Sequence, residues 1–328
     1  MKVGIVGCGL IGSRRADFLG EDEIVIVADV SEQRAKELAD KYNCKFATDY
    51  RKVTQNPEVE AVIIATTNQF LAEIATDAIH NNKHCLIEKP GARTLVEYEQ
   101  LMNLAKEKEV QVKIGYNHRF HPSFQKAREI VDSREIGEVM FVRGRYGHGG
   151  RLGYDKEWRA DPQKSGGGEM LDQGTHLIDL ARWFCGEFTE VNGHVGTFFW
   201  NMPVEDNGFA LLKTENGKVA WLTASCTQWK NLFSFEIHCK TGLLVIDGLG
   251  GSYGKETLTF YKMKPEMGIP DQEQWSWEED DSWKKEWQEF STAIAHGSEV
   301  MSSIEESYGN FKVVSELYKA NDTKIHNP

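Results

Sequence analysis

Three glycines near the start of the chain have the spacing of a turn that binds phosphate groups. Gly7, Gly9 and Gly12 follow an apolar run at residues 2–6 and precede a segment in which apolar residues recur at helical spacing. In that context Gly7 permits a tight turn, Gly9 lets the backbone approach a pyrophosphate, and Gly12 lets the helix pack closely on the strand. Because the N-terminus of a helix attracts anions, the pattern predicts a dinucleotide-binding site.

One acidic residue indicates which dinucleotide would bind. Asp29 ends the second apolar run, residues 24–28, where a carboxylate can accept hydrogen bonds from the adenosine ribose. A 2′-phosphate about 4 Å from this carboxylate would cost about 4 kcal/mol at an effective dielectric constant near 20. We therefore expect NAD, although Ser31 and Arg34 lie close enough in sequence to keep NADP open. The expected contacts to this half of the cofactor are Gly7, Gly9, Leu10, Ile11, Gly12, Asp29, Val30 and Arg34.

A carboxylate and an imidazole far along the chain could handle a proton. Asp172 and His176 are four residues apart within a predicted helix at residues 170–184, so they share one helix face. A histidine titrates near neutral pH and can accept a hydroxyl proton, while a neighbouring carboxylate orients and polarises its ring. By spacing alone, a salt-bridged surface pair is the competing interpretation.

Lys89 is the third candidate, in the sequence Glu88-Lys89-Pro90 directly after an apolar run at residues 84–87. Ligands of open parallel sheets bind outside the carboxyl ends of the strands, so this position favours a site residue over a solvated turn.

The elements that must position these residues change character near residue 120. Before it, short apolar runs alternate with helical patterns, as in the βαβ units of a parallel sheet. After it come strand-like runs separated by turn signals, which predict an antiparallel sheet. The predicted fold is α/β: a Rossmann domain at residues 1–120, then an α/β domain at residues 121–328 with a large open, mostly antiparallel sheet. The predicted last helix, residues 304–320, has the option of packing on the first domain.

Composition excludes several classes of protein. The 328 residues carry a formal net charge of −12, which disfavours nucleic-acid binding. No apolar run is long enough to span a membrane, and the first run is better explained as a strand than as a signal peptide. The six cysteines form no CxxC pair, so we expect reduced thiols, no metal site and a cytoplasmic location.

Over essentially its whole length the chain resembles the family of glucose-fructose oxidoreductase, inositol dehydrogenase and their rhizopine-catabolism relatives (Gfo/Idh/MocA). The resemblance rests on the glycine turn, Asp29, AVIIATTN at 61–68, NNKHCLIEKP at 81–90, GYNHRFHP at 115–122 and DQGTH at 172–176. It implies that Lys89, Asp172 and His176 are catalytic and that the bond before Pro90 is cis. Whether Lys89 or His176 takes the proton stays open.

The same resemblance implies further contacts. Thr66, Asn68, Glu88, Lys89, Asn117, Trp158 and Arg159 would contact the cofactor, mainly on the nicotinamide side. Tyr116 and Asn117 would line the cleft; the alternative for this segment is a structural crossover held by Arg119.

A basic segment points to the substrate. Residues 143–159 hold five cations against two anions, and arginine forks suit phosphate oxygens while aromatic rings stack on sugars or bases. This suggests a nucleotide-linked sugar, although the arginines could equally pair with acidic neighbours or a partner subunit. The expected substrate contacts are Tyr116, Arg145, Arg151, Tyr154, Asp172 and His176.

The leading interpretation is an NAD-dependent oxidoreductase that acts on a ring secondary hydroxyl of a sugar, nucleotide sugar or cyclitol. A homodimer or homotetramer is expected, because an open sheet with exposed aromatic residues needs a cover. Two alternatives stay open: an NAD-dependent glycoside hydrolase that uses transient oxidation, and a non-catalytic NAD-binding regulatory protein.

Overall fold

The computed structural model describes residues 1–266 and 268–321. The chain divides into two compact units, and the first contains residues 1–116, 163–165 and 283–308. The second contains residues 117–162, 166–282 and the chain from residue 309 onward. Residues 267 and 322–328 of the predicted second domain lie outside the described residues.

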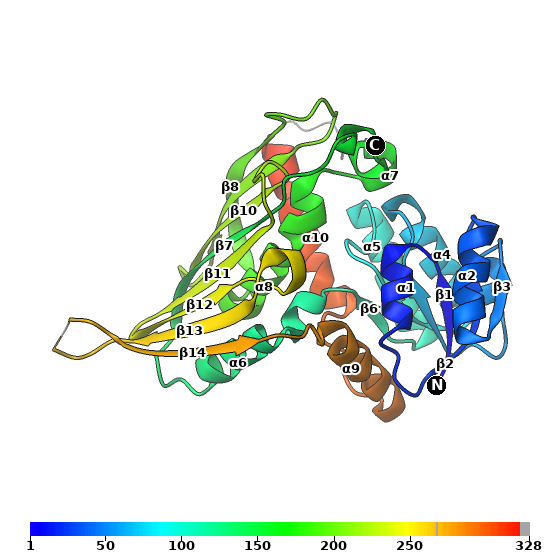
Figure 1. Cartoon of the computed structure of the whole chain (residues 1–328), viewed down its shortest axis with the longest axis horizontal. Helices are drawn as coiled ribbons and strands as arrows, with labels where there is room; N and C mark the ends of the chain where they lie inside the picture. The colour runs from blue at the N-terminus through cyan, green and yellow to red at the C-terminus, as the bar shows by residue number, and fades with distance from the viewer. Residues whose placement is uncertain (267, 322–328) are drawn as a thin grey trace. The chain divides into compact units, whose positions relative to one another are not determined.

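The first unit is built on a six-stranded parallel sheet with the strand order β3-β2-β1-β4-β5-β6 (Figure 1). Its strands are β1 (Lys2–Val6), β2 (Glu23–Ala28), β3 (Lys45–Ala47), β4 (Ala61–Ile64), β5 (His84–Ile87) and β6 (Val112–Ile114). Its helices are α1 (Leu10–Ala16), α2 (Glu32–Tyr42), α3 (Arg51–Thr54), α4 (Asn68–His80), α5 (Leu95–Lys108) and most of α9 (Ser282–His296). This is the doubly wound Rossmann order, in which the crevice at the carboxyl ends of β1 and β4 receives ligands. The predicted fold class is confirmed.

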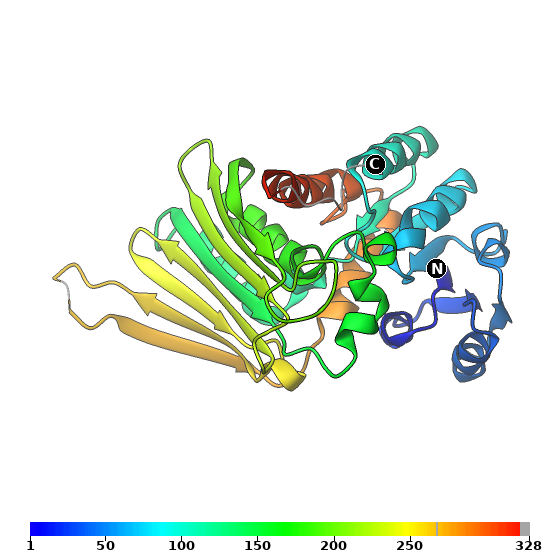
Figure 2. The same cartoon turned by 90° about the horizontal axis from the view of Figure 1, so that it is seen from above.

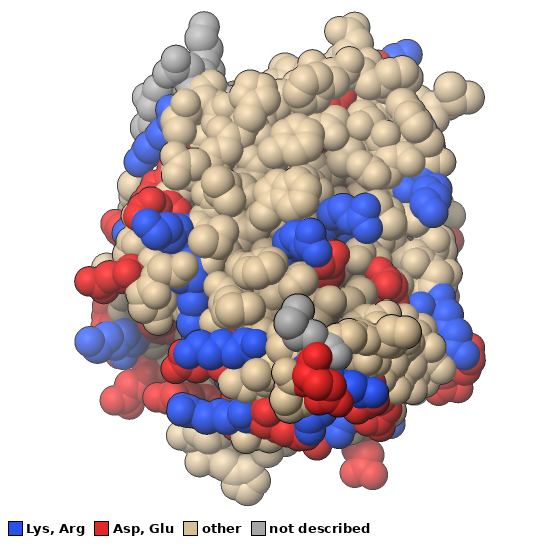
Figure 3. Space-filling view, turned by 90° about the vertical axis from the view of Figure 1, so that its left-hand side faces the viewer, with Lys and Arg blue, Asp and Glu red and all other residues tan. Residues whose placement is uncertain are grey.

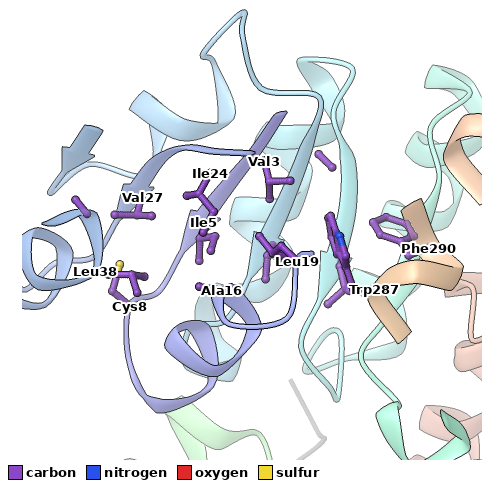
Figure 4. Packing of buried hydrophobic residues seen from close by; sticks show 14 of the residues in the cluster. Val3, Ile5, Cys8, Ala16, Leu19, Ile24, Val27, Leu38, Trp287 and Phe290 are labelled. Atoms are coloured by element: carbon purple, nitrogen blue, oxygen red, sulfur yellow. The ribbon is translucent and has the colours of Figure 1, made fainter. Parts of the chain in front are cut away.

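The core of this unit explains why its strands are continuous apolar runs. Parallel strands are covered on both faces, so β4 is buried at every position. On one face Ile5 packs in a cluster with Leu38 of α2 and with Trp287 and Phe290 of α9 (Figure 4). Residues more than 240 positions apart in sequence thereby complete one core.

The second unit is built on an eight-stranded sheet in the order β14-β13-β12-β11-β7-β10-β9-β8. Its strands are β7 (Val139–Gly147), β8 (Phe188–Gly196), β9 (Asn207–Thr214), β10 (Val219–Ser225), β11 (Leu232–Cys239), β12 (Gly242–Asp247), β13 (Glu256–Lys262) and β14 (Asp271–Trp277). All neighbours pair antiparallel except β7 and β10, which are parallel. The predicted mostly antiparallel sheet is confirmed.

Helices cover one face of this sheet. They are α6 (Pro122–Asp132), α8 (Thr175–Cys185) and part of α10 (Ile304–Ala320), and α8 packs on β7 and β10 (Figure 2). Short elements complete the unit: the 3₁₀ turns η1 (Asn117–Phe120), η2 (Tyr154–Lys156), η3 (Trp158–Ala160) and η5 (Gly251–Tyr253), and the π-helical turn η4 (Met170–Gly174). The short helix α7 (Pro162–Ser165) belongs mostly to the first unit. Within the described residues, the other face of the sheet is open and carries exposed Phe209, Leu211 and Trp221.

Two features differ from the sequence-based expectations. The strands β3, β7 and β14 were not predicted; in β7 the arginines alternate with buried Val142, Gly144 and Tyr146. The predicted helix at residues 170–184 begins with the π-helical turn η4, so the α-helical spacing assumed for Asp172 and His176 does not hold at its start. Five of the six cysteines are buried free thiols, whereas Cys44 is partly exposed.

Candidate active site

The glycine turn has the geometry that the phosphate-binding motif requires. Gly7 has a φ of +97°, and a Cβ there would lie 2.3 Å from the Ala65 carbonyl oxygen; a Cβ on Gly12 would lie 1.8 Å from that of Gly7. A Cβ on Gly9 would meet no atom within 4 Å. Gly9 is also the N-cap of α1 and supplies no side-chain cap, so the first N–H groups of the helix are available to an anion. These residues fit a dinucleotide phosphate.

Asp29 is held in place by three donors. One carboxylate oxygen accepts from the Cys8 N–H at 2.9 Å, and the other accepts from the Ser31 N–H at 2.8 Å and from the Arg34 guanidinium at 3.1 Å. The carboxylate is therefore fixed directly after β2, beside the glycine turn. Arg34 places a positive charge against it, as the sequence suggested.

Two large apolar side chains near this turn are almost fully exposed. Leu10, at the start of α1, is 84% exposed, and Val30, after Asp29, is 88% exposed. Both were predicted to contact the cofactor, and an adenosine moiety covering them would remove apolar surface from water.

The segment that carries Lys89 is anchored by a buried arginine. The Lys89–Pro90 bond is cis, as the resemblance implied. The preceding Glu88 is buried, and one of its oxygens accepts from Arg15 Nε at 2.6 Å. Arg15 also pairs with Glu286 of α9. The Glu88 carboxylate thus holds the segment within the first unit.

Two residues after β4, Thr66 and Asn68, were predicted to contact the nicotinamide side of the cofactor. Thr66 is partly exposed at the carboxyl end of the strand. Asn68, in contrast, is buried at the start of α4, and its amide donates to the Ser165 carbonyl oxygen at 2.7 Å. Its side chain therefore ties a distant piece of chain to the first unit.

In the second unit the structure brings Asp172 together with the predicted Trp158-Arg159 pair. Arg159 Nε donates to an Asp172 oxygen at 3.1 Å, and its guanidinium lies over the Trp158 ring at 4.7 Å. The nearby negative charge of Asp172 is the main cause that raises the pKa of Arg159. His176 follows in the first turn of α8 and is 5% exposed. Asp172 and His176 are therefore not a solvated surface pair.

Sequence reasoning missed His118. Its ring stacks on that of His176, with centroids 3.9 Å apart and 25° between the planes. His121 lies 5.5 Å beyond His118, and its Nδ1 is 2.8 Å from a Glu256 oxygen. The sequence signal was a pair of histidines three residues apart in NHRFH. Nothing local indicated that one of them would stack on His176.

The neighbours of His118 have structural contacts. Tyr116 is fully buried, and the Asn117 amide donates to Ser282 Oγ at 3.0 Å. Arg119 forms a buried, two-point ion pair with Asp179 of α8, with both N–O distances 2.7 Å. The interpretation of this segment as a crossover held by Arg119 is supported by that pair.

A buried carboxylate holds the glycine run that leads into η4. Glu205 accepts hydrogen bonds from the Gly168 and Met170 N–H groups, both at 3.0 Å, and from the Tyr318 hydroxyl. Burial raises the pKa of Glu205 to about 7, because these hydrogen bonds only partly compensate for lost hydration. Glu205 therefore fixes the chain at the start of η4, the turn that carries Asp172.

The basic segment at residues 143–159 does not form one patch. Since side chains alternate along β7, Arg143 and Arg145 are on the open face of the sheet, while Tyr146 is on the face that carries α8 and His176. Arg143 pairs with Glu236 and Arg151 with Glu157, as the competing interpretation expected. Tyr154 is buried in a small cluster with Trp200, Val204 and Cys226.

The described residues show neither a metal-binding group nor a membrane-spanning helix. Residues 1–266 and 268–321 contain no group of three or more His, Cys, Asp or Glu side chains placed to hold a metal ion. In the same residues, each helix is too short or too polar to cross a membrane.

Comparison with protein families gives two matches. Residues 1–116 match an oxidoreductase family with an NAD-binding Rossmann fold, and residues 124–245 match the GFO/IDH/MocA C-terminal domain. Together these segments cover most of the chain, and they meet close to the border between the two units.

Several characterised proteins are similar to the chain. Levoglucosan dehydrogenase of Pseudarthrobacter phenanthrenivorans is 32% identical over 203 residues, which are 58% of this chain and 50% of that protein. Inositol 2-dehydrogenase of Salmonella paratyphi B is 31% identical over 194 residues, 57% of this chain and 55% of that protein. The matched segments thus span about half the length of these relatives.

Solved structures share the fold over nearly the whole chain. Levoglucosan dehydrogenase in complex with NADH and L-sorbose superposes with a TM-score of 0.85 at 23% identity, covering 98% of this chain and 97% of that one. UDP-N-acetylglucosamine 3-dehydrogenase from Acidithiobacillus ferrooxidans gives a TM-score of 0.85 at 22% identity, covering 100% and 99%.

Proposed function

The chain belongs to the GFO/IDH/MocA family of oxidoreductases, and we propose that it is an NAD-dependent dehydrogenase of a ring secondary hydroxyl in a sugar, nucleotide sugar or cyclitol. The observation that carries this proposal is the glycine turn, where Gly9 has open space above it and Asp29 is fixed beside it. The named relatives act on levoglucosan and inositol, which have the same chemistry at the reacting carbon.

The proposed chemistry divides between the two units. Gly9 and Asp29 would hold the dinucleotide, which would supply the acceptor for the hydride of the carbinol carbon. We assign the hydroxyl proton to His176, whose imidazole is buried at the start of α8. Asp172, held by Arg159, supports that ring, and Lys89 stabilises the developing alkoxide with its positive charge.

The substrate contacts follow from the same assignment. Asp172 and His176 would contact the reacting hydroxyl. Arg151, before η2, and Tyr154, in η2, would border the rest of the substrate. Tyr116 and Asn117 stay in the proposal as candidate substrate contacts. Arg145 is not proposed as a substrate contact, because it lies on the open face of the sheet, opposite to His176.

A panel of substrates tests the proposal. Sugars, cyclitols and nucleotide sugars are supplied with NAD or NADP, and the reduced cofactor is read by absorbance. Net NADH formation with at least one ring alcohol is expected. Cleavage of a glycoside without net NADH would indicate the glycoside hydrolase, and tight NAD binding without turnover of any compound would indicate the regulatory protein.

We also propose a homo-oligomer that buries the open face of the eight-stranded sheet. Trp221 and Leu211 are cross-strand neighbours on that face, and Phe209 lies two residues along β9. Figure 3 shows uncharged side chains over much of this face, with Lys or Arg side chains near its middle. Exposed apolar surface of this kind is typical of an interface. A cytoplasmic location completes the proposal, since free cysteines are kept reduced there.

A further inference from the structure

Three imidazole rings of the second unit lie in a row, formed by His176 of α8, His118 of η1 and His121 just after it. We call it the histidine row. The centroids of His176 and His118 are 3.9 Å apart, and those of His118 and His121 are 5.5 Å apart. All three side chains are buried; His118 is 6% exposed. Titratable rings this close and this dry cannot ionise independently.

The stacking geometry excludes a direct hydrogen bond between His118 and His176. The ring N–H and nitrogen lone pair lie in the plane of an imidazole, and the two planes are within 25° of parallel. The rings therefore act on each other through charge and contact. At an effective dielectric constant of about 20, two positive charges 3.9 Å apart repel enough to move a protonation midpoint by more than about one pH unit.

Two carboxylates lie at the end of the row away from His176. His121 Nδ1 is 2.8 Å from a Glu256 oxygen, and its Nε2 is 3.8 Å from an Asp280 oxygen. The Nδ1 atom of His118 is 3.2 Å from the Asn117 side-chain oxygen. Carboxylates are thus concentrated at His121, and a positive charge on His118 would oppose protonation of His176.

The remaining neighbours leave this asymmetry in place. Asp172, on η4, is already paired with Arg159, and Asp179 is paired with Arg119. From β7, the Tyr146 ring is 6.2 Å from that of His176, and Tyr253 of η5 lies behind Tyr146. Burial raises the pKa of Tyr146 well above its usual value, so it adds no charge near neutral pH. The titratable partner with the shortest ring separation from His176 among these is His118.

We propose that His118 is a positioning residue that holds the His176 ring by stacking and keeps it neutral, and so ready to accept the substrate proton. The inference rests on the proposed function, in which His176 is the proton acceptor. Removal of His118 should therefore change the pH dependence of the reaction more than it changes the maximal rate.

The variant His118→Phe tests the charge while it keeps an aromatic face against His176. The acid limb of the kcat/KM profile for alcohol oxidation should move to higher pH by about one unit, because His176 no longer competes with a second imidazole. On the alkaline plateau kcat should stay within about threefold of the wild type. The matched control is His296→Phe, since His296 is an exposed histidine at the end of α9, outside the row; its profile should not move.

An NMR titration of the His176 ring, in protein without substrate, separates the inference from the proposed function. The wild type should lose its proton at lower pH than His118→Phe. Equal midpoints would overturn the inference, whatever the activity. A shifted midpoint in a protein that forms no NADH with any ring alcohol would overturn the proposed function and leave the inference standing. If the Phe variant fails to fold, His118→Gln is titrated in its place, with the same expected shift.

Discussion

Arg15 donates a hydrogen bond of 2.6 Å from Nε to a carboxylate oxygen of Glu88, so the helix that follows the glycine turn is tied to the residue next to Lys89. Both side chains are buried, and Glu286 supplies a second carboxylate to the same guanidinium. The Trp283 ring lies 4.6 Å from that guanidinium on another side. The cofactor turn and the proposed electrostatic catalyst therefore share one buried ion-pair network within the first unit.

Removal of Arg15 should destabilise the protein strongly. Arg15→Met leaves the Glu88 and Glu286 carboxylates buried without their common partner, which typically costs about 3–5 kcal/mol. The free energy of unfolding by urea measures the loss. Arg14→Met is the matched control, because Arg14 is an exposed arginine one position away on the same helix; it should change stability by less than about 0.5 kcal/mol. Similar losses for the two variants would contradict the importance of the network.

Asp29 should determine the choice between NAD and NADP. Asp29→Asn removes the negative charge that opposes a 2′-phosphate and leaves Arg34 in place. The ratio of kcat/KM for NADP to that for NAD should rise at least about tenfold, since the repulsion amounts to about 4 kcal/mol at close range. Glu32→Gln, which neutralises an exposed carboxylate three residues on, should leave the ratio unchanged. An equal ratio in the wild type and the Asp29 variant would show that the carboxylate does not face the ribose.

Glu205 should make stability depend on pH. Its pKa rises from 4.5 to about 7 in the folded protein because it is buried. The folded state therefore holds a proton that the unfolded state releases, and stability falls as pH rises from about 4.5 to about 7. The loss should approach about 3 kcal/mol above pH 7.

The variant Glu205→Gln carries no titrating group at this position. Its free energy of unfolding should fall less between pH 5 and pH 8 than that of the wild type, by about 2–3 kcal/mol. Glu215→Gln, in the exposed turn between β9 and β10, is the control and should follow the wild-type curve. Parallel curves for the wild type and the Glu205 variant would mean that Glu205 ionises normally.

The open face of the sheet should carry the subunit interface. Trp221→Glu places a charge beside Leu211 on this face, and it should shift the protein toward monomers in analytical ultracentrifugation. Leu152→Glu changes an equally apolar and fully exposed residue off the sheet, and it should leave the assembly unchanged. A wild-type protein that is monomeric at every concentration would contradict the interface.

The first unit was predicted well because its signals are local. A parallel strand is a continuous apolar run, and Ser31 at the start of α2 is a residue type that commonly caps a helix, as it does here. The glycine spacing placed Asp29 beside the turn, where Cys8 N–H donates to it. Each of these features depends on residues within one βαβ unit.

The second unit was predicted less completely because its features depend on partners distant in sequence. For the arginines of residues 143–159 the sequence left open an anion-binding patch or pairing with acidic neighbours; in the structure, pairing of β7 with β11 gives Arg143 the partner Glu236. The π-helical turn η4 begins where Glu205 accepts hydrogen bonds from Gly168 and Met170, residues distant from it in sequence. His118 meets His176 only after η1 packs on α8, so no spacing in the sequence could reveal the stack.

The most direct test of the central claim is a count of reduced cofactor against oxidised substrate. Purified protein is incubated with NAD and each ring alcohol of the panel, and NADH is measured together with the ketone product, in the wild type and in His176→Gln. We predict one NADH for each ketone in the wild type, with kcat lowered about 10²–10⁴-fold in the variant. Product without net NADH, or a variant as fast as the wild type, would contradict the account.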